Sequence, residues 1–165
     1  MMQLRTLLSG LILFSNKKIR IFKDCCSMKI PKEEIVQLLH FGNEDFCPHL
    51  SKIVDIEAYA EKLRQYAEFL IIGTPSNILG WMAYYKNEPG KFLYITHFWV
   101  NRFCQKRGYG KYLLDKLILV DGGEYNEVCV EIYKEDVGAL TFYDKNGFKL
   151  KEDRIDRVLL SRNIQ

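Results

Sequence analysis

The sequence has little that would divide it into domains or anchor it in a membrane. It contains only 4 prolines in 165 residues, and neither a Pro/Gly/Ser-rich linker nor an internal repeat interrupts it. One apolar stretch, residues 7–14 behind a lone Arg5, resembles a weak signal peptide. That stretch is far shorter than a membrane span of roughly 20 residues, and no A-x-A-like cleavage site follows it. The sequence therefore predicts a single domain over residues 1–165, located in the cytoplasm and not at a membrane.

The N-terminal segment has two interpretations. Its apolar stretch is better explained as a first helix or strand than as a leader peptide. Met28 is an alternative start, which would make residues 1–27 an N-terminal extension. The sequence leaves both open.

The cysteines lack the spacing of a disulfide framework or a metal site. There are 5 of them, an odd number, with no C-x-x-C pair and no histidine at ligand spacing. Adjacent Cys25 and Cys26 could form a redox pair, but thiols in a reducing cytoplasm are more often inert. We therefore expect neither structural disulfides nor a bound metal.

Excess charge of one sign is also missing. The formal net charge is +3, too small to predict nucleic acid as a partner, because nucleic-acid-binding domains carry clustered Lys and Arg. Hydrophobic residues make up 48% and charged residues 27% of the chain, the ordinary composition of a folded globular protein. A packed core is expected.

Helical periodicity appears first in the chain, in two segments. Glu33–His40 follows Pro31, and a second helix begins after Asp55, whose carboxylate can cap it. The inward face of this second helix carries Ile56, Tyr59, Ala60, Leu63 and Ala67. A loop with Gly42, Asn43 and Pro48 separates the two helices.

Strand patterns follow, rich in aromatic and branched residues. They cover Phe69–Ile72, Ile78–Tyr85 and Phe92–Val100, with turn residues between them, which predicts an antiparallel meander. The third strand is apolar on both faces, which predicts a central position in the sheet.

The rest of the chain alternates helices and strands. A helix carries Leu113, Leu114, Leu117 and Ile118, and a strand covers Val128–Tyr133. A helix capped by Asp136 ends at Asn146-Gly147, and short strands follow at Phe148–Leu150 and Arg157–Ser161. The predicted fold class is α+β, with a mixed, mostly antiparallel sheet flanked by helices in a three-layer sandwich.

The loop between the third strand and its following helix has the chemistry of an anion site. A helix N-terminus presents unpaired N–H groups and a partial positive charge. Gly108 and Gly110 let the backbone approach a ligand closely, and three cations lie beside them: Lys106, Arg107 and Lys111. This combination suits a pyrophosphate, although a glycine-rich turn with a solvated charge run is the alternative.

Spacing excludes two well-known phosphate loops. The Walker loop requires Ser or Thr after its lysine, where this chain has Tyr112. The dinucleotide fingerprint G-x-G-x-x-G fails because Leu113 stands at its third glycine.

Two segments instead match one known family. Q-x-x-G-x-G at 105–110 resembles the pyrophosphate loop R/Q-x-x-G-x-G/A of the GNAT (N-acetyltransferase) superfamily. Downstream, A-x-x-F-Y-x-K-x-G-F at 139–148 resembles a second segment of that family, in the family's order. The resemblance covers residues 68–150, and the two helices before it agree only in layout.

The resemblance implies an N-acetyltransferase that moves the acetyl group of acetyl-CoA to a primary amine. Backbone groups of Phe98, Trp99 and Val100 would pair with the pantetheine arm. Tyr143 would protonate the departing thiolate as general acid. The pyrophosphate would be held by Gln105, Lys106, Arg107, Gly108, Tyr109, Gly110 and Lys111. Asp136 departs from the family pattern, which commonly has Asn there, so direct contact of that residue with the cofactor is in doubt.

Attack on the thioester needs a neutral amine, so a base or a water chain must accept a proton. His97 is one candidate by its position and by an unperturbed pKa of about 6.5. Alternatively it is a buried structural histidine, because Leu93, Ile95 and Trp99 are expected on the same face. Glu131 is the second candidate.

The acceptor is not encoded in any recognisable motif. His40, Glu44, Asp45 and His49 lie around the loop where this family builds its acceptor site, or they are ordinary solvated residues. We expect a small-molecule amine such as a sugar amine, an amino-acid derivative or a polyamine, and the oligomeric state is open. The alternative is a catalytically silent acyl-CoA-binding or regulatory domain.

Overall fold

The computed structural model describes residues 21–22, 30–74 and 77–164. The predictions for the apolar stretch at 7–14, for Cys25 and Cys26, and for a start at Met28 lie outside these residues.

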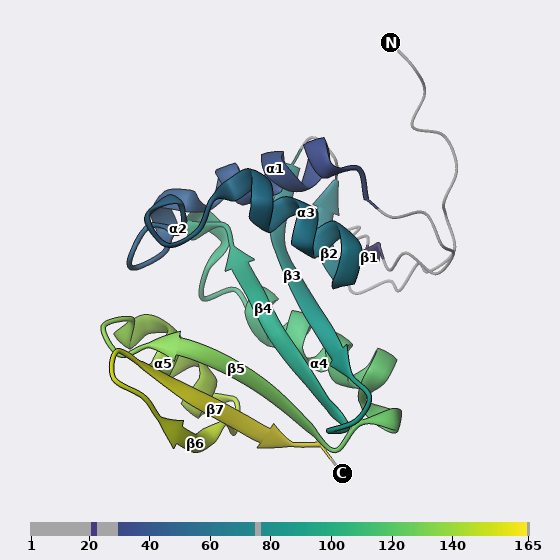
Figure 1. Ribbon diagram of the computed structural model, residues 1–165, viewed down its shortest axis with the longest axis vertical. Helices are drawn as coiled ribbons and strands as arrows, with labels where there is room; N and C mark the ends of the chain where they lie inside the picture. Colours follow the sequence, from purple (N-terminus) through teal and green to yellow (C-terminus); the bar gives the residue numbers. More distant parts are fainter. Residues whose placement is uncertain (1–20, 23–29, 75–76, 165) are drawn as a thin grey trace.

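The described residues form one seven-stranded sheet in the order β1-β2-β3-β4-β5-β7-β6 (Figure 1). All neighbours are antiparallel except β4 and β5, which are parallel. The strands are β1 Ile21–Phe22, β2 Glu68–Thr74, β3 Asn77–Asn87, β4 Phe92–Val100, β5 Glu127–Tyr133, β6 Lys149–Asp153 and β7 Arg157–Asn163. The predicted mixed sheet, its meander and the central place of β4 are confirmed.

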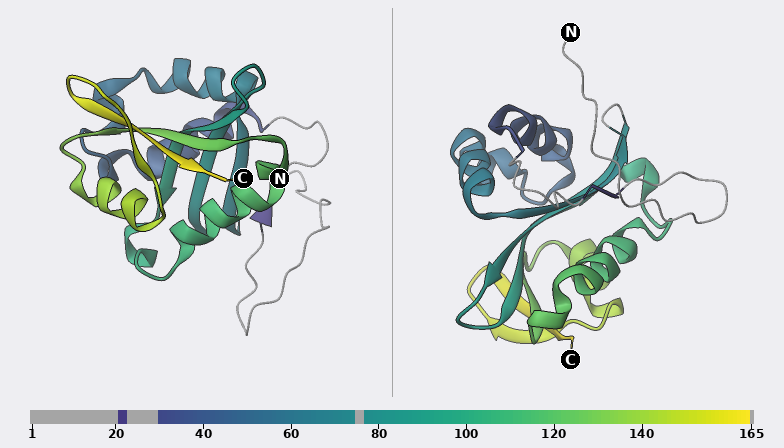
Figure 2. Two further views of the ribbon diagram at one scale, coloured as in Figure 1. Left: turned by 90° about the horizontal axis from the view of Figure 1, so that it is seen from below. Right: turned by 90° about the vertical axis from the view of Figure 1, so that its right-hand side faces the viewer.

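Helices cover both faces of the sheet (Figure 2). One side carries α1 Lys32–Phe41, α2 Leu50–Ile53 and α3 Ile56–Tyr66, and the other carries α4 Tyr109–Asp121 and α5 Val137–Lys145. Both predicted caps are present: Asp55 Oδ1 accepts the Ala58 N–H at 2.7 Å, and Asp136 Oδ1 accepts the Ala139 N–H at 2.8 Å. Short 3-10 turns lie at Asn43–Asp45, Arg102–Cys104 and Gly122–Glu124. No helix in the described ranges is long and apolar enough to cross a membrane.

Two apolar clusters, one on each face, hold these layers together. The first lies between the sheet and α4 and α5, around Leu70, Met82, Leu113, Leu117 and Tyr143. The second lies between the sheet and α1–α3, around Ile35, Leu39, Leu63, Trp81 and Trp99. Strand β3 contributes side chains to both clusters, because successive side chains of a strand point to opposite faces.

Strand β4 changes face in its middle. Its register with β3 pairs Ala83 with His97 and then Tyr84 with Ile95, so Thr96 is an extra residue without a partner, which is a β-bulge. Leu93 and Ile95 consequently pack in the first cluster, whereas Trp99 packs in the second. The prediction that His97 shares a face with Leu93 and Ile95 is therefore wrong, because strict alternation breaks at the bulge.

The same point ends the pairing of β4 with β5. The parallel ladder runs only from Phe92 opposite Glu127 to Ile95 opposite Val130. Beyond it, β5 continues to Tyr133 along β7, and β4 continues to Val100 along β3. Figure 1 shows the two strands diverging from their shared end.

Candidate active site

The second half of β4 presents an open backbone edge. From His97 to Val100 the strand pairs with β3 on one side, and on its other side no strand of the described ranges pairs with it. Main-chain N–H and C=O groups on such an edge can pair with an extended ligand as an added strand would. The edge is walled by α5, since the Phe98 ring lies 5.5 Å from that of Phe142 and 6.2 Å from that of Tyr143.

Beyond this edge the chain enters α4 through a left-handed cap. Gly108, the N-cap residue, has φ +88°, and Lys106 also has a positive φ, +59°. The Tyr112 N–H donates to the Gly108 carbonyl at 2.9 Å, so the preceding N–H groups of α4 have no acceptor within the helix. Those groups, at the positive end of the helix dipole, form a cradle for an anion.

The two glycines of this loop are required for different structural reasons. A Cβ on Gly108 would meet no atom within 4 Å, so this residue is needed for its positive φ and leaves the cradle open. A Cβ on Gly110 would lie 2.9 Å from the Phe142 ring, so Gly110 is needed for close packing of α4 on α5. The sequence had suggested one role, ligand approach, for both.

The polar side chains of the loop differ in whether they have a partner within the chain. Gln105 Nε2 donates to the Val100 carbonyl at 3.2 Å and so fastens the loop to the end of β4. Lys111 Nζ pairs with Asp115 at 2.7 Å, one turn along α4. Lys106 and Arg107 make no ion pair with any residue that the structure describes, which leaves their charges available to an anion.

Tyr143 lies on α5 beside the open edge and is 3% exposed. Its ring packs edge-on against Phe148 and Phe142, with centroids at 4.9 and 5.2 Å. Burial, aided by the charge of Asp136, raises the pKa of Tyr143 well above its usual value, so the hydroxyl keeps its proton. Within the described part of the chain no hydrogen-bond partner of this hydroxyl is found, so its proton is not committed elsewhere.

His97 is on the other face of β4, 4% exposed. Its ring stacks on Trp81 with centroids 4.0 Å apart, and Phe46 lies at 4.9 Å. Burial lowers the pKa of His97 to about 3, so the assumption of an unperturbed pKa is wrong. The imidazole is neutral at any working pH, and its Nε2 has no partner among the described residues.

Glu131, the second candidate base, is held by two arginines. One oxygen accepts a hydrogen bond from Arg154 and the other accepts one from Arg157 Nη1 at 2.9 Å. Arg157 also donates to the Tyr133 hydroxyl at 2.7 Å and lies over its ring at 4.4 Å. The Glu131 carboxylate therefore already holds two arginine side chains in place.

A pocket of about 560 Å³ opens where β4 and β5 part, on the side of α2 and α3. Ile95 and Thr96 of β4 and Glu131 of β5 lie at the parting, and Tyr59 and Lys62 of α3 form part of the wall. The sequence predicted Tyr59 in the core and gave Thr96 no role, because neither the bulge at Thr96 nor its contact with Tyr59 of α3 follows from residue spacing.

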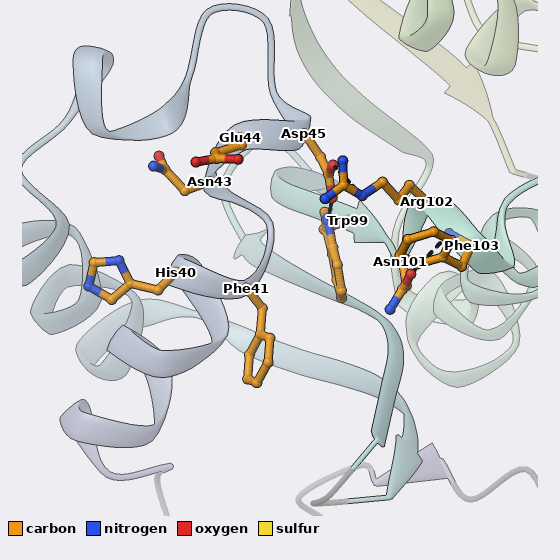
Figure 3. Close-up of a pocket in the computed structure, with 9 residues that line it drawn as sticks. All are labelled: His40, Phe41, Asn43, Glu44, Asp45, Trp99, Asn101, Arg102 and Phe103. Atoms are coloured by element: carbon orange, nitrogen blue, oxygen red, sulfur yellow. Dashed lines mark hydrogen bonds and ion pairs between the residues drawn. The ribbon is translucent and has the colours of Figure 1, made fainter.

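A second pocket, of about 400 Å³, lies near the end of β4 (Figure 3). His40, Glu44 and Asp45 of the predicted acceptor loop line it together with Trp99, whereas His49 lines neither pocket. Asp45 has a structural contact here, since its Oδ2 accepts the Trp99 Nε1–H at 2.7 Å. In the described residues no group of three or more His, Cys, Asp or Glu side chains could hold a metal ion.

Comparison with known proteins identifies the family and the fold. The model of the acetyltransferase (GNAT) family matches residues 33–148. No curated protein matches the chain significantly.

Solved structures with the same fold cover most of the chain. An acetyltransferase of the GNAT family from Staphylococcus aureus Mu50 is 18% identical, with a TM-score of 0.68 over 89% of this chain and 99% of that one. The PaiA N-acetyltransferase of Thermoplasma acidophilum, in complex with coenzyme A, is 15% identical, with a TM-score of 0.66 over 89% and 99%. A GNAT family acetyltransferase from Elizabethkingia anophelis with acetyl-CoA bound is 19% identical, with a TM-score of 0.61 over 88% and 97%.

Proposed function

This chain belongs to the acetyltransferase (GNAT) family and is an acyltransferase, and we propose that it transfers the acetyl group of acetyl-CoA to a primary amine of a small molecule. The observation that carries the proposal is the continuity of the site. The open edge of β4 leads directly into the Gly108 cradle of α4, and Tyr143 stands beside that edge.

The site offers a place for each part of the cofactor. We place the pantetheine arm along the backbone of Phe98, Trp99 and Val100, where a ligand can complete the sheet. The pyrophosphate lies at the N-terminus of α4, within reach of the uncommitted Lys106 and Arg107. The similar structures that hold coenzyme A or acetyl-CoA support this choice of cofactor.

Tyr143 then acts as the general acid. When the amine nitrogen attacks the thioester carbon, a C–N bond forms and the C–S bond breaks, so the sulfur leaves as a thiolate that needs a proton. The Tyr143 hydroxyl supplies it, because burial keeps this group protonated and no described partner occupies it.

The acceptor enters from the side of α2 and α3. The pocket of about 560 Å³ reaches the parting of β4 and β5 from the face opposite α5, so amine and cofactor approach the same point from two sides. The pocket near Trp99 offers a second place for a larger acceptor.

His97 and Glu131 are both retained as candidates for the proton acceptor. Turnover of His97→Ala and Glu131→Gln, measured as a function of pH, separates them, because loss of the true base lowers the rate and changes its pH profile. An unchanged profile in both variants assigns the proton to a water chain.

The engagement of both candidate bases in other contacts favours one second function, a silent acyl-CoA-binding domain. Release of free thiol from acetyl-CoA, measured with a panel of sugar amines, amino acids and polyamines, tests the two. Amine-dependent release with a mass gain of one acetyl group on the amine supports the enzyme. Cofactor binding without release from any amine supports the silent domain.

A further inference from the structure

The bulge in β4 leaves the backbone of Thr96 without a partner in the sheet. Thr96 has no partner in β3, and the ladder with β5 has already ended at Ile95. A half-buried carbonyl left without a hydrogen bond is unfavourable, so something outside the sheet has to bind it.

Tyr59 of α3 binds this carbonyl. Its hydroxyl lies 2.9 Å from the Thr96 carbonyl oxygen, to which it donates, and 3.1 Å from Thr96 Oγ1. These contacts join residues 37 positions apart in the chain, so they fix α3 against the bulge. Burial raises the pKa of Tyr59 far above its usual value, so the hydroxyl remains a donor at every working pH.

We propose that Tyr59 is a positioning residue for the acyl-CoA site: by holding the bulge at Thr96, its hydroxyl sets the face and register of the open edge at Phe98–Val100. The inference rests on the proposed function, because it assumes that this edge binds pantetheine.

The bulge decides which side chains face the cofactor. If it shifted by one residue, every side chain from His97 to Val100 would turn to the opposite face. Phe98 would then leave Phe142 and Tyr143, and Trp99 would leave the cluster under α1. Even partial loosening of the bulge would misalign the edge with Tyr143.

The pyrophosphate cradle has anchors of its own beyond the bulge. Gln105 ties its loop to the Val100 carbonyl, but the Asn101 N–H also donates to the Leu79 carbonyl at 2.9 Å, and the Gly108 cap belongs to α4. A loosened bulge should therefore weaken the binding of pantetheine and leave the binding of the nucleotide unchanged. A merely structural tyrosine would weaken both equally, through loss of folded protein.

Two ligands separate these outcomes: coenzyme A, and 3′-phosphoadenosine 5′-diphosphate, which is coenzyme A without pantetheine. Their Kd values are measured by calorimetry for the wild type, for Tyr59→Phe, and for the control Tyr66→Phe on the same helix, where the side chain is 68% exposed. Sucrose and low temperature keep a destabilised variant folded during the measurement.

We expect Tyr59→Phe to bind coenzyme A about tenfold more weakly, the equivalent of one lost hydrogen bond, with the nucleotide Kd unchanged. Tyr66→Phe should match the wild type for both ligands. Thr96→Val, which keeps the carbonyl, should stay near the wild type, and a loss as large as that of Tyr59→Phe would contradict the role of the carbonyl.

Unchanged coenzyme A affinity in Tyr59→Phe, or equal loss for both ligands, overturns the inference and leaves the proposed function intact. A wild type that binds neither ligand overturns both.

Discussion

The two halves of β4 show how one strand serves two purposes. From Phe92 to Ile95 it pairs on both sides and its Leu93 and Ile95 are buried in the core. From His97 to Val100 it pairs, among the described strands, on one side only, and it borders the cradle, Tyr143 and the pocket of about 400 Å³. A single extra residue, Thr96, separates the two halves. The ladder with β5 ends just before it, and the alternation of side chains between the two faces of the sheet is reversed after it. The closed half should therefore govern stability, and the open half should govern binding and chemistry.

The largest expected effect lies at the open half. Tyr143→Phe should lower the single-turnover rate by roughly 10²–10⁴-fold, the range for a positioned general acid. Its stability should hardly change, because the hydroxyl has no hydrogen-bond partner among the described residues to leave behind. Melting temperature and rate are measured on one preparation, with Tyr112→Phe on α4 as control. Full activity in Tyr143→Phe would remove this residue from the mechanism.

The closed half should show the reverse pattern. Leu93 is 0% exposed, so Leu93→Ala should lower the free energy of unfolding by about 2–5 kcal/mol through lost burial and a cavity. Affinity for acetyl-CoA in the folded fraction should stay near that of the wild type. Denaturant titration and calorimetry measure the two quantities. A variant with intact stability and weakened binding would show that the halves are not divided in this way.

The face reversal at Thr96 also predicts a pH effect on stability. Burial lowers the pKa of His97 to about 3, whereas in the unfolded chain it is about 6.5, so the unfolded state takes up the proton first. The stability linked to this residue is complete above pH 6.5 and is lost as the pH falls toward 3. Between pH 6.5 and 5 the loss should reach up to about 1.4 kcal/mol per pH unit.

His97→Phe keeps the aromatic stack on Trp81 and should flatten this slope, while His40→Gln on α1 should keep it. Denaturant titrations across that pH range measure the slope. An equal slope in the wild type and in His97→Phe would mean that another group carries the dependence.

The smallest effect is expected at the cradle. Gly108→Ala should destabilise the protein by about 1–2 kcal/mol through its positive φ alone, because nothing lies within 4 Å of the new methyl group. Thermal protection by acetyl-CoA should weaken as well, since the methyl group occupies the open cradle. Gly138→Ala, inside α5, is the control and should stabilise slightly. Undiminished protection in Gly108→Ala would place the phosphate site elsewhere.

The sequence was informative wherever the cause of structure is local. The caps at Asp55 and Asp136 are set within one helical turn, and the meander follows from turn residues between strongly apolar strands. The cradle was recognisable because Gly108 and its neighbours lie together in the chain.

Features that depend on distant partners were not predictable. A period of two assumes an unbroken strand, so it placed His97 with Leu93 and Ile95 and missed the bulge at Thr96. The low pKa of His97 comes from packing against Trp81 and Phe46, and the contact of Tyr59 with Thr96 spans two layers. None of these follows from residue type and spacing alone.

The most direct test of the proposed function is the melting temperature of the wild type with and without acetyl-CoA. A ligand that binds only the folded state stabilises it by about 2.7 kcal/mol at a hundredfold excess over its Kd. We predict a rise in melting temperature that grows with acetyl-CoA concentration. A melting temperature unchanged at saturating acetyl-CoA would contradict the assignment of the open edge and its cradle as the cofactor site.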